Sequence, residues 1–301
     1  MLSKICFFCK KEDAKLSARS KYVFKDFIFI AESIDIEQKD KKIMPIIKRI
    51  FLLFILLIAL NNCDSLLNND ISEPKGGVCL TFDDVYVNEW YKLSNLLKLS
   101  DFNATFFISK IHSLSSSEIH NLRKLDSLGF EIGCHGWNHI NAVDYLTHYS
   151  LAEYYNVEIL PALNFMNKNN LSPTSFTYPR GMHNDSLDQY LLQKFQVLRC
   201  VTLEQVKPLT VNVEDISEIF IKKNKSQIVA GLGIDKQFKI SEDMLYNALE
   251  RASENDEILI LYAHCPVDSN AQHYQINKSY IENLILKCEE LNLKSYRISE
   301  I

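Results

Sequence analysis

The chain has few of the residues that mark disordered or fibrous proteins, because only eight of its 301 residues are glycine and seven are proline. This composition argues against long low-complexity tracts. The chain also lacks an excess of basic residues, and its formal net charge of −5 argues against a nucleic-acid partner. With 47% hydrophobic residues, it is long enough for one large domain with a substantial core.

The N-terminal quarter contains an apolar run that is too short to cross a bilayer comfortably. This run, Ile50–Leu60, follows Lys48 and Arg49 and has the length of a signal-peptide hydrophobic core. Cys63 follows almost at once, and the arrangement resembles a bacterial lipoprotein signal in which Cys63 is lipidated. We therefore expect an exported protein that is membrane-anchored on the cell envelope. The alternative is an uncleaved N-terminal anchor, which leaves the domain on the same side of the membrane.

The position of Met44 divides the N-terminal region into two parts. Residues 1–43 are mixed, charged and without a clear period, and Met44 stands where a signal peptide would naturally begin. We interpret residues 1–43 as a spurious upstream extension and residues 44–63 as the signal peptide. Residues 64–75 are polar and are expected to tether the anchor to one domain at residues 76–301.

Disulfides are not expected to hold this domain together. Its cysteines are odd in number, and most lie in or beside apolar runs, where a free thiol behaves as a small hydrophobic side chain. They are Cys79, Cys134, Cys200, Cys265 and Cys288.

From residue 77 onward, short apolar runs alternate with longer amphipathic segments, which predicts parallel strands joined by crossover helices in a single α/β domain. Strands are expected at 78–82, 104–108, 131–134, 175–178, 197–201 and 257–262. Helices are expected over 89–99, 116–128, 148–169, 186–195, 241–253 and 279–291, with Pro161 bending or breaking the third. The segment 203–240 is the least readable, with short apolar runs at Ile219–Ile221 and Ile228–Ala230.

Residues able to carry chemistry follow several of these strands. Asp83 and Asp84 end the first strand. The pair His135 and His139 follows the third strand, and His264 ends the last. In a barrel of parallel strands the carboxyl ends form the catalytic face, so these side chains are expected to converge there.

A carboxylate and two neutral imidazoles can together hold one divalent metal ion and leave positions open for water and substrate. A second carboxylate beside them can accept a proton from water. Taken singly, the aspartate pair is more simply explained as a polar strand end or helix cap, and the histidine pair as surface or core residues. The two clusters together favour a metal-dependent hydrolase.

Four segments of the chain, in this order, resemble successive motifs of the polysaccharide deacetylases, carbohydrate esterase family four. The segments are Thr81–Asp84, His135–His139, Phe176–Gly181 and Leu261–His264, and the resemblance covers roughly residues 76–298. It implies a distorted (β/α) barrel that removes acetyl groups from N-acetylated polysaccharides, or from O-acetylated ones in some members. The implied partner is an acetylated glycan substrate.

The resemblance also implies roles for individual residues. Asp83 matches the catalytic base of the family, and His264 matches the general acid that protonates the leaving amine. Asp84, His135 and His139 match the ligands of one divalent ion, usually zinc and sometimes cobalt or nickel.

Further residues match the surroundings of that centre. The main-chain N–H of Tyr178 matches a donor to the oxyanion, and Pro179 is expected to fix the loop that aims it. Leu261 and Tyr262 are candidates for the acetyl pocket.

The chain departs from the family motifs at Ser175, at the fourth motif, at Tyr262, where many members have leucine, and at Cys265, where aspartate is common. Ser175 stands where the family often has an arginine that orients the base, and we expect Arg199, or else Arg180, to supply the guanidinium. The tryptophan-bearing fourth motif is not found, since Trp90 and Trp137 are the only tryptophans. Two alternatives therefore stay open: an exported carbohydrate-binding lipoprotein of the same fold with little or no turnover, and a related barrel amidohydrolase acting on a small non-sugar amide.

Overall fold

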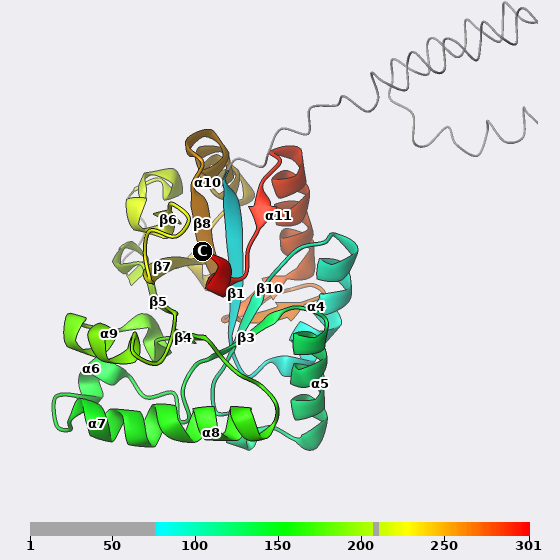
Figure 1. Ribbon diagram of the computed structural model, residues 1–301. Coiled ribbons are helices and arrows are strands. Elements are labelled where there is room, and N and C mark those ends of the chain that lie inside the picture. The colour runs from blue at the N-terminus through cyan, green and yellow to red at the C-terminus, as the bar shows by residue number, and fades with distance from the viewer. Residues whose placement is uncertain (1–75, 207–210) are drawn as a thin grey trace, which may run out of the picture. The chain divides into compact units, whose positions relative to one another are not determined.

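The computed structural model describes residues 76–206 and 211–301 (Figure 1). The predictions of a signal peptide, a lipidated Cys63 and a tether lie outside the described residues. In the described part, parallel strands pair in the order β1, β2, β3, β4, β5, β7 and β8, and β8 pairs again with β1. This pairing closes a seven-stranded barrel, which confirms the predicted fold class.

The barrel strands lie close to the positions predicted from the apolar runs, and β7 begins at the short apolar run noted in the least readable segment. Their bounds are β1 Gly77–Asp84, β2 Thr105–Ile108, β3 Glu131–Cys134, β4 Ser175–Thr177, β5 Val197–Val201, β7 Ile228–Gly233 and β8 Ile258–Ala263. The barrel is distorted because some neighbours pair over very short stretches. The pairing of β3 with β4 involves one residue of each strand, and that of β7 with β8 involves two.

Short strands outside the barrel were not predicted. Their bounds are β6 Phe220–Ile221, β9 Cys265–Val267, β10 Gln275–Asn277 and β11 Lys294–Ser295. β6 pairs antiparallel with β8, and β11 extends the sheet beside the start of β1. β9 and β10 form a separate parallel pair directly after the barrel.

Helices follow most of the barrel strands. Their bounds are α4 Val87–Leu99, α5 Ser116–Ser127, α6 Ala142–Tyr145, α7 Leu151–Tyr154, α8 Leu160–Lys168, α9 Asp185–Leu191, α10 Glu242–Asn255 and α11 Lys278–Glu290. α4 lies beside α5, and α10 beside α11 (Figure 1). α5 begins at a capping box formed by Ser115 and Glu118, and the chain leaves it through Gly129 at a φ of 93°. Within residues 76–206 and 211–301, no helix combines the length and the apolar character needed to span a bilayer.

The long helix expected over 148–169 is divided by a π-helical turn. This turn covers Tyr155–Ile159 between α7 and α8, and Pro161 lies in the first turn of α8, where it has no N–H to donate to the preceding turn. π-helical turns are rare and occur often at functional sites. The turn contains Glu158, a carboxylate that is completely buried.

Side chains alternate along each barrel strand between an outer core and the barrel interior. Val78, Leu80 and Phe82 pack in the outer core with the helices, whereas Cys79 belongs to a second cluster in the interior. That second cluster consists of Cys79, Phe107, Val197, Val229, Ile258, Ile260, Tyr296, Ile298 and Ile301. Its last three members come from the C-terminal segment.

The C-terminal segment closes the amino end of the barrel. The N–H of Ile298 donates to Oγ1 of Thr105 at 3.0 Å, and the N–H of Ser299 donates to Oε2 of Glu131 at 2.9 Å. Thr105 and Glu131 are the first residues of β2 and β3. Among the described residues, the C-terminal segment therefore fills and covers this end of the barrel.

The five cysteines of the described part are free and buried, in agreement with the expectation that no disulfide network supports the domain.

Candidate metal centre and catalytic cavity

The carboxyl ends of the barrel strands surround a cavity of about 600 Å³. Its walls combine acidic, imidazole and aromatic side chains from strands and loops that are distant in the sequence. The lining residues are Asp83, Asp84, His135, His139, Tyr178, Arg180, Gly181, Val201, Thr202, Phe238, Tyr262, His264 and Tyr274. The chemically active residues identified after separate strands thus face one cavity.

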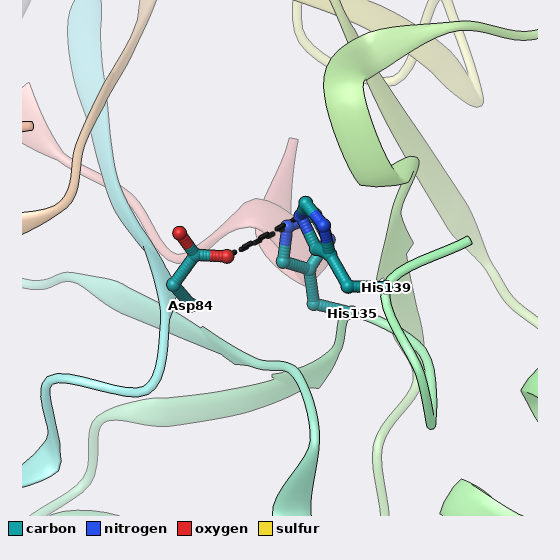
Figure 2. A group of neighbouring side chains, drawn as sticks. All are labelled: Asp84, His135 and His139. Atoms are coloured by element: carbon teal, nitrogen blue, oxygen red, sulfur yellow. Dashed lines mark ion pairs between the residues drawn. The ribbon is translucent and has the colours of Figure 1, made fainter. Parts of the chain in front are cut away.

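Asp84, His135 and His139 form a compact group on one wall of this cavity (Figure 2). Oδ1 of Asp84 lies 3.6 Å from Nε2 of His135 and 3.3 Å from Nε2 of His139. One donor atom from each of the three residues lies within 4.8 Å of the others. Tetrahedral zinc sites with bonds of about 2.0–2.1 Å have ligand atoms roughly 3.3–3.5 Å apart, so the spacing fits a metal ion.

The protonation of His135 also fits a metal ligand. Its Nδ1 lies 2.8 Å from the carbonyl oxygen of Thr177, and because a carbonyl only accepts, Nδ1 carries the proton and Nε2 keeps its lone pair. Burial lowers the pKa of His135 to about 3, against the opposing effect of the Asp84 carboxylate. Burial likewise lowers the pKa of His139. Neutral imidazoles beside a carboxylate are a donor set that accepts zinc, and also cobalt or nickel.

Two of these three residues adopt backbone conformations that are unusual for residues other than glycine. The φ angle is 85° at Asp84 and 64° at His139. Such conformations cost about 1–3 kcal/mol each and persist only where the surroundings enforce them. At Asp84 the surroundings include Ser109, whose N–H donates to the Asp84 carbonyl at 3.0 Å and whose hydroxyl donates to Oδ1 at 3.5 Å.

Asp83 occupies a different environment from its neighbour Asp84. Its Oδ2 forms an ion pair with Nη2 of Arg199. Its Oδ1 is buried and has no hydrogen-bond partner among the described residues. One oxygen of the carboxylate is therefore held by Arg199, and the other has no partner among the described residues, in a side chain that lines the cavity.

The barrel interior is built to hold the guanidinium of Arg199. This side chain is 1% exposed and packs against the rings of Tyr262 and Phe107, at 4.7 and 5.6 Å from their centroids. A Cβ at Gly231 would come within 3.3 Å of the arginine, so glycine provides the room. Arg199 thus reaches Asp83 through the interior of the barrel.

Arg180 and Ser175 do not share this position. Arg180 is exposed at the cavity and forms no ion pair with Asp83 in the described structure. The hydroxyl of Ser175 donates to Oε1 of Glu131 at 2.5 Å, deeper in the barrel. Of the two arginines considered from the sequence, Arg199 is the one that contacts the acid.

His264 is held by a carboxylate that the sequence reasoning missed. Asp235, which is 1% exposed, lies with Oδ2 2.5 Å from Nδ1 of His264, and its Oδ1 accepts the His264 N–H at 3.0 Å. Burial lowers the pKa of His264, but the hydrogen bond and charge of Asp235 and the charges of Asp83 and Asp84 raise it above the ordinary value. Asp235 follows β7 closely, so the signal that identified Asp83 and Asp84, an acid after an apolar strand, could have found it.

A tryptophan also supports His264, although it does not lie in the motif where one was sought. The indole Nε1 of Trp90, on α4, donates to the carbonyl oxygen of His264 at 2.8 Å. Trp90 is fully buried and packs on the ring of Phe106.

The expectation for the Tyr178 main chain was wrong. Its N–H donates to the carbonyl of Arg199 at 3.0 Å, because the pairing of β4 with β5 continues one residue beyond β4. Tyr178 is among the residues that line the cavity, but its ring packs in the outer core, where its hydroxyl donates to Oδ1 of Asp188 at 2.5 Å. Pro179 is buried and opens a short 3₁₀ turn over Pro179–Gly181, in which Arg180 has a φ of 62°.

The two acetyl-pocket candidates point in opposite directions. Tyr262 lines the cavity, whereas Leu261 packs in the outer core among the helices. Neighbouring residues on β8 cannot share one pocket, because their side chains alternate between the two faces of the strand. The prediction for Leu261 was wrong.

Comparisons with known proteins agree with the motifs. Residues 70–196 match the family profile described as polysaccharide deacetylase, which confirms the resemblance. No curated protein matches the chain.

Solved structures similar to the chain include three whose names describe carbohydrate esterases or deacetylases. A family 4 carbohydrate esterase from Streptomyces lividans is 17% identical, over 73% of this chain and 91% of that chain, with a TM-score of 0.48. The peptidoglycan deacetylase PdaC from Bacillus subtilis is 16% identical, over 76% and 91%, with a TM-score of 0.47. The chitin deacetylase from Colletotrichum lindemuthianum is 15% identical, over 75% and 87%, with a TM-score of 0.47.

The geometry of the three donors predicts that the protein binds one zinc ion per chain and that His139→Ala weakens this binding. The loss is expected to exceed the roughly 10- to 100-fold effect of changes outside the ligand set, because a donor atom itself is removed. Metal analysis after dialysis and isothermal titration calorimetry measure the change. His120→Ala, which alters an exposed histidine, is the matched control. Unchanged zinc affinity in His139→Ala would remove this residue from the ligand set.

Proposed function

Since the chain resembles the polysaccharide deacetylases over residues 70–196, we propose that it is a metal-dependent hydrolase that removes acetyl groups from an N-acetylated or O-acetylated polysaccharide. The observation that carries this proposal is the meeting of three groups at one cavity. These groups are a half-free carboxylate, a three-residue donor set and a histidine held by a buried acid. Together they can supply the activated water, the polarised carbonyl and the proton for the leaving amine that hydrolysis of an amide needs.

Asp84, His135 and His139 are the residues that would hold the ion. When bound, a divalent metal supplies a Lewis acid for the acetyl carbonyl and lowers the pKa of water toward ~7. Asp83 is the proposed base: its free Oδ1 accepts a proton from the attacking water, while Arg199 holds Oδ2 and fixes the direction of the carboxylate.

His264 is the proposed general acid. Asp235 binds its Nδ1, so Nε2 is the atom directed to the cavity, where it lies 3.9 Å from Oδ2 of Asp84. As the water oxygen bonds to the acetyl carbon, the carbon–nitrogen bond breaks and the amine leaves with the proton from Nε2. The raised pKa of His264 favours the protonated form that this step requires.

The cavity walls next to His264 support a sugar substrate. Phe238, Tyr262 and Tyr274 line this side, and Tyr274 is 46% exposed with its ring 4.9 Å from that of His264. Aromatic rings offer the flat apolar surface and polar edge that a sugar ring can stack on and bind.

Acetate release tests this proposal directly. Zinc-loaded protein is expected to liberate acetate from acetylated chito-oligosaccharides or peptidoglycan, and Asp83→Asn should reduce the rate by about 10²–10⁴-fold, since a positioned base is lost. Asp83→Asn should retain zinc, and Asp243→Asn, which alters an exposed acid on α10, should keep full activity.

Each other outcome contradicts part of the proposal. Full activity in Asp83→Asn would refute the assigned base. Binding of the oligosaccharides without acetate release would instead support a carbohydrate-binding protein. Release from a small non-sugar amide alone would support the amidohydrolase.

Asp235→Asn tests the role of His264 through the leaving group. The variant should lower the rate of amide hydrolysis by about 10²–10⁴-fold, because the imidazole loses the partner that sets its tautomer and protonation. An aryl acetate, whose phenolate leaves without a proton, should be hydrolysed at nearly the normal rate. Equal losses on both substrates, at unchanged zinc content, would contradict a role in leaving-group protonation.

We further propose that the domain is exported and anchored to the envelope through a lipidated Cys63. The support is the sequence of residues 44–63, which lie outside the described structure. Labelled palmitate should be incorporated into the protein in cells and should be absent from Cys63→Ala. Equal labelling of both proteins would reject the lipidation site.

A further inference from the structure

Glu158 is a fully buried acid with an unusual set of partners. It is 0% exposed, lies in the π-helical turn Tyr155–Ile159, and forms no ion pair within the described residues. Burial raises the pKa of Glu158, and hydrogen bonds from main-chain N–H groups oppose that effect. A buried carboxylate without a cation is costly, so its partners identify what it stabilises.

These partners belong to the loop that carries His135 and His139. Oε2 of Glu158 accepts the N–H of Asn138 at 2.8 Å, and Oε1 accepts the N–H of Ile140 at 2.8 Å. The residues on both sides of His139 are therefore bound to one carboxylate.

The main chain of the π-helical turn binds the same loop. The carbonyl of Glu158 accepts the N–H of Trp137 at 2.8 Å, and the carbonyl of Val157 accepts the side-chain amide of Asn138 at 3.2 Å. The π-helical turn thus holds residues 137–140 through main-chain and side-chain acceptors together.

Gly136 permits this close approach. A Cβ at this position would lie 2.2 Å from Oε1 of Glu158, and the φ angle is +85°, which glycine adopts freely. The loop therefore has Gly136 at the point of closest approach to the Glu158 carboxylate. His139 has a left-handed backbone conformation, and the N–H groups of the residues before and after it are bound by Glu158.

We propose that Glu158 is a positioning residue for the metal centre. It holds His139 in its left-handed conformation, at a φ of 64°, so that the imidazole meets Asp84 and His135 before a metal ion binds. This inference rests on the proposed function only in assuming that the three residues bind a metal.

Zinc affinity measured by calorimetry tests the proposal with Glu158→Gln. Glutamine has one acceptor oxygen, and its NH₂ group would face the second main-chain N–H, so one of the two bonds is lost. The dissociation constant for zinc is expected to rise about 10–100-fold, the range found for changes just outside a ligand set.

Glu131→Gln is the matched control, because Glu131 lies at the opposite end of β3. It accepts hydrogen bonds from Thr105, Ser175 and Ser299 and contacts none of the three donors. This variant should lose thermal stability and keep its zinc affinity. Equal zinc affinity in wild type and Glu158→Gln would overturn the inference while leaving the proposed function intact. Absence of zinc binding in wild type would reject the metal centre, and the inference with it.

Hydrogen exchange of the metal-free wild-type protein gives a second test. It needs no variant, so the result cannot be affected by misfolding of a variant. The N–H groups of Asn138 and Ile140 should be protected from exchange without metal, since the carboxylate already binds them. Fast exchange of both groups in the metal-free protein would show that metal, not Glu158, orders the loop, and would overturn the proposal.

Discussion

This site depends on the close spacing of three metal-ligating side chains, Asp84, His135 and His139. Nε2 of His135 cannot donate a hydrogen bond to Asp84, because the proton of the ring is on Nδ1, which binds the Thr177 carbonyl. Oδ1 of Asp84 lies 3.6 Å from this Nε2. A cation among the three donors would attract a lone pair from each of them. In its absence the fold must hold them, and the left-handed conformations of Asp84 and His139 show where that cost falls.

The neighbouring aspartates have different partners because successive strand residues face opposite sides. The side chain of Asp83 points into the barrel and forms an ion pair with Arg199, which packs against Tyr262 and beside Gly231. Asp84 ends the strand and turns toward the histidines. Asp83 is thus paired through one oxygen with the guanidinium of Arg199, and its other oxygen has no partner among the described residues. Asp84 lies with the histidines, where it would bind the proposed metal ion.

The sequence predicted what depends on local pattern and on strand ends. Most barrel strands, the break near Pro161 and the meeting of Asp83, Asp84, His135, His139 and His264 follow from these signals. Contacts across the barrel could not be predicted in this way. The error at Leu261 arose because the sequence did not show which face of β8 its side chain is on. The error at the Tyr178 N–H arose because the sequence did not show how far the pairing of β4 with β5 extends. Asp235 and Glu158 were missed, since one lies in the unreadable segment and the other inside a helical apolar run.

Ser175 stands where the family motif often has an arginine, and the structure shows that Arg199 takes the place of that arginine beside Asp83. This replacement bears on whether the protein is an enzyme. Ser175 and Thr177 of β4 pair with Val197 and Arg199 of β5, so the arginine enters the interior from the adjacent strand. A buried guanidinium is expensive unless a charge of opposite sign meets it. Here that charge is Asp83, whose remaining oxygen has no partner in the described structure. A carboxylate oriented by a buried cation at the cavity supports the proposed role of Asp83 as a base, a role that binding of a glycan alone would not require.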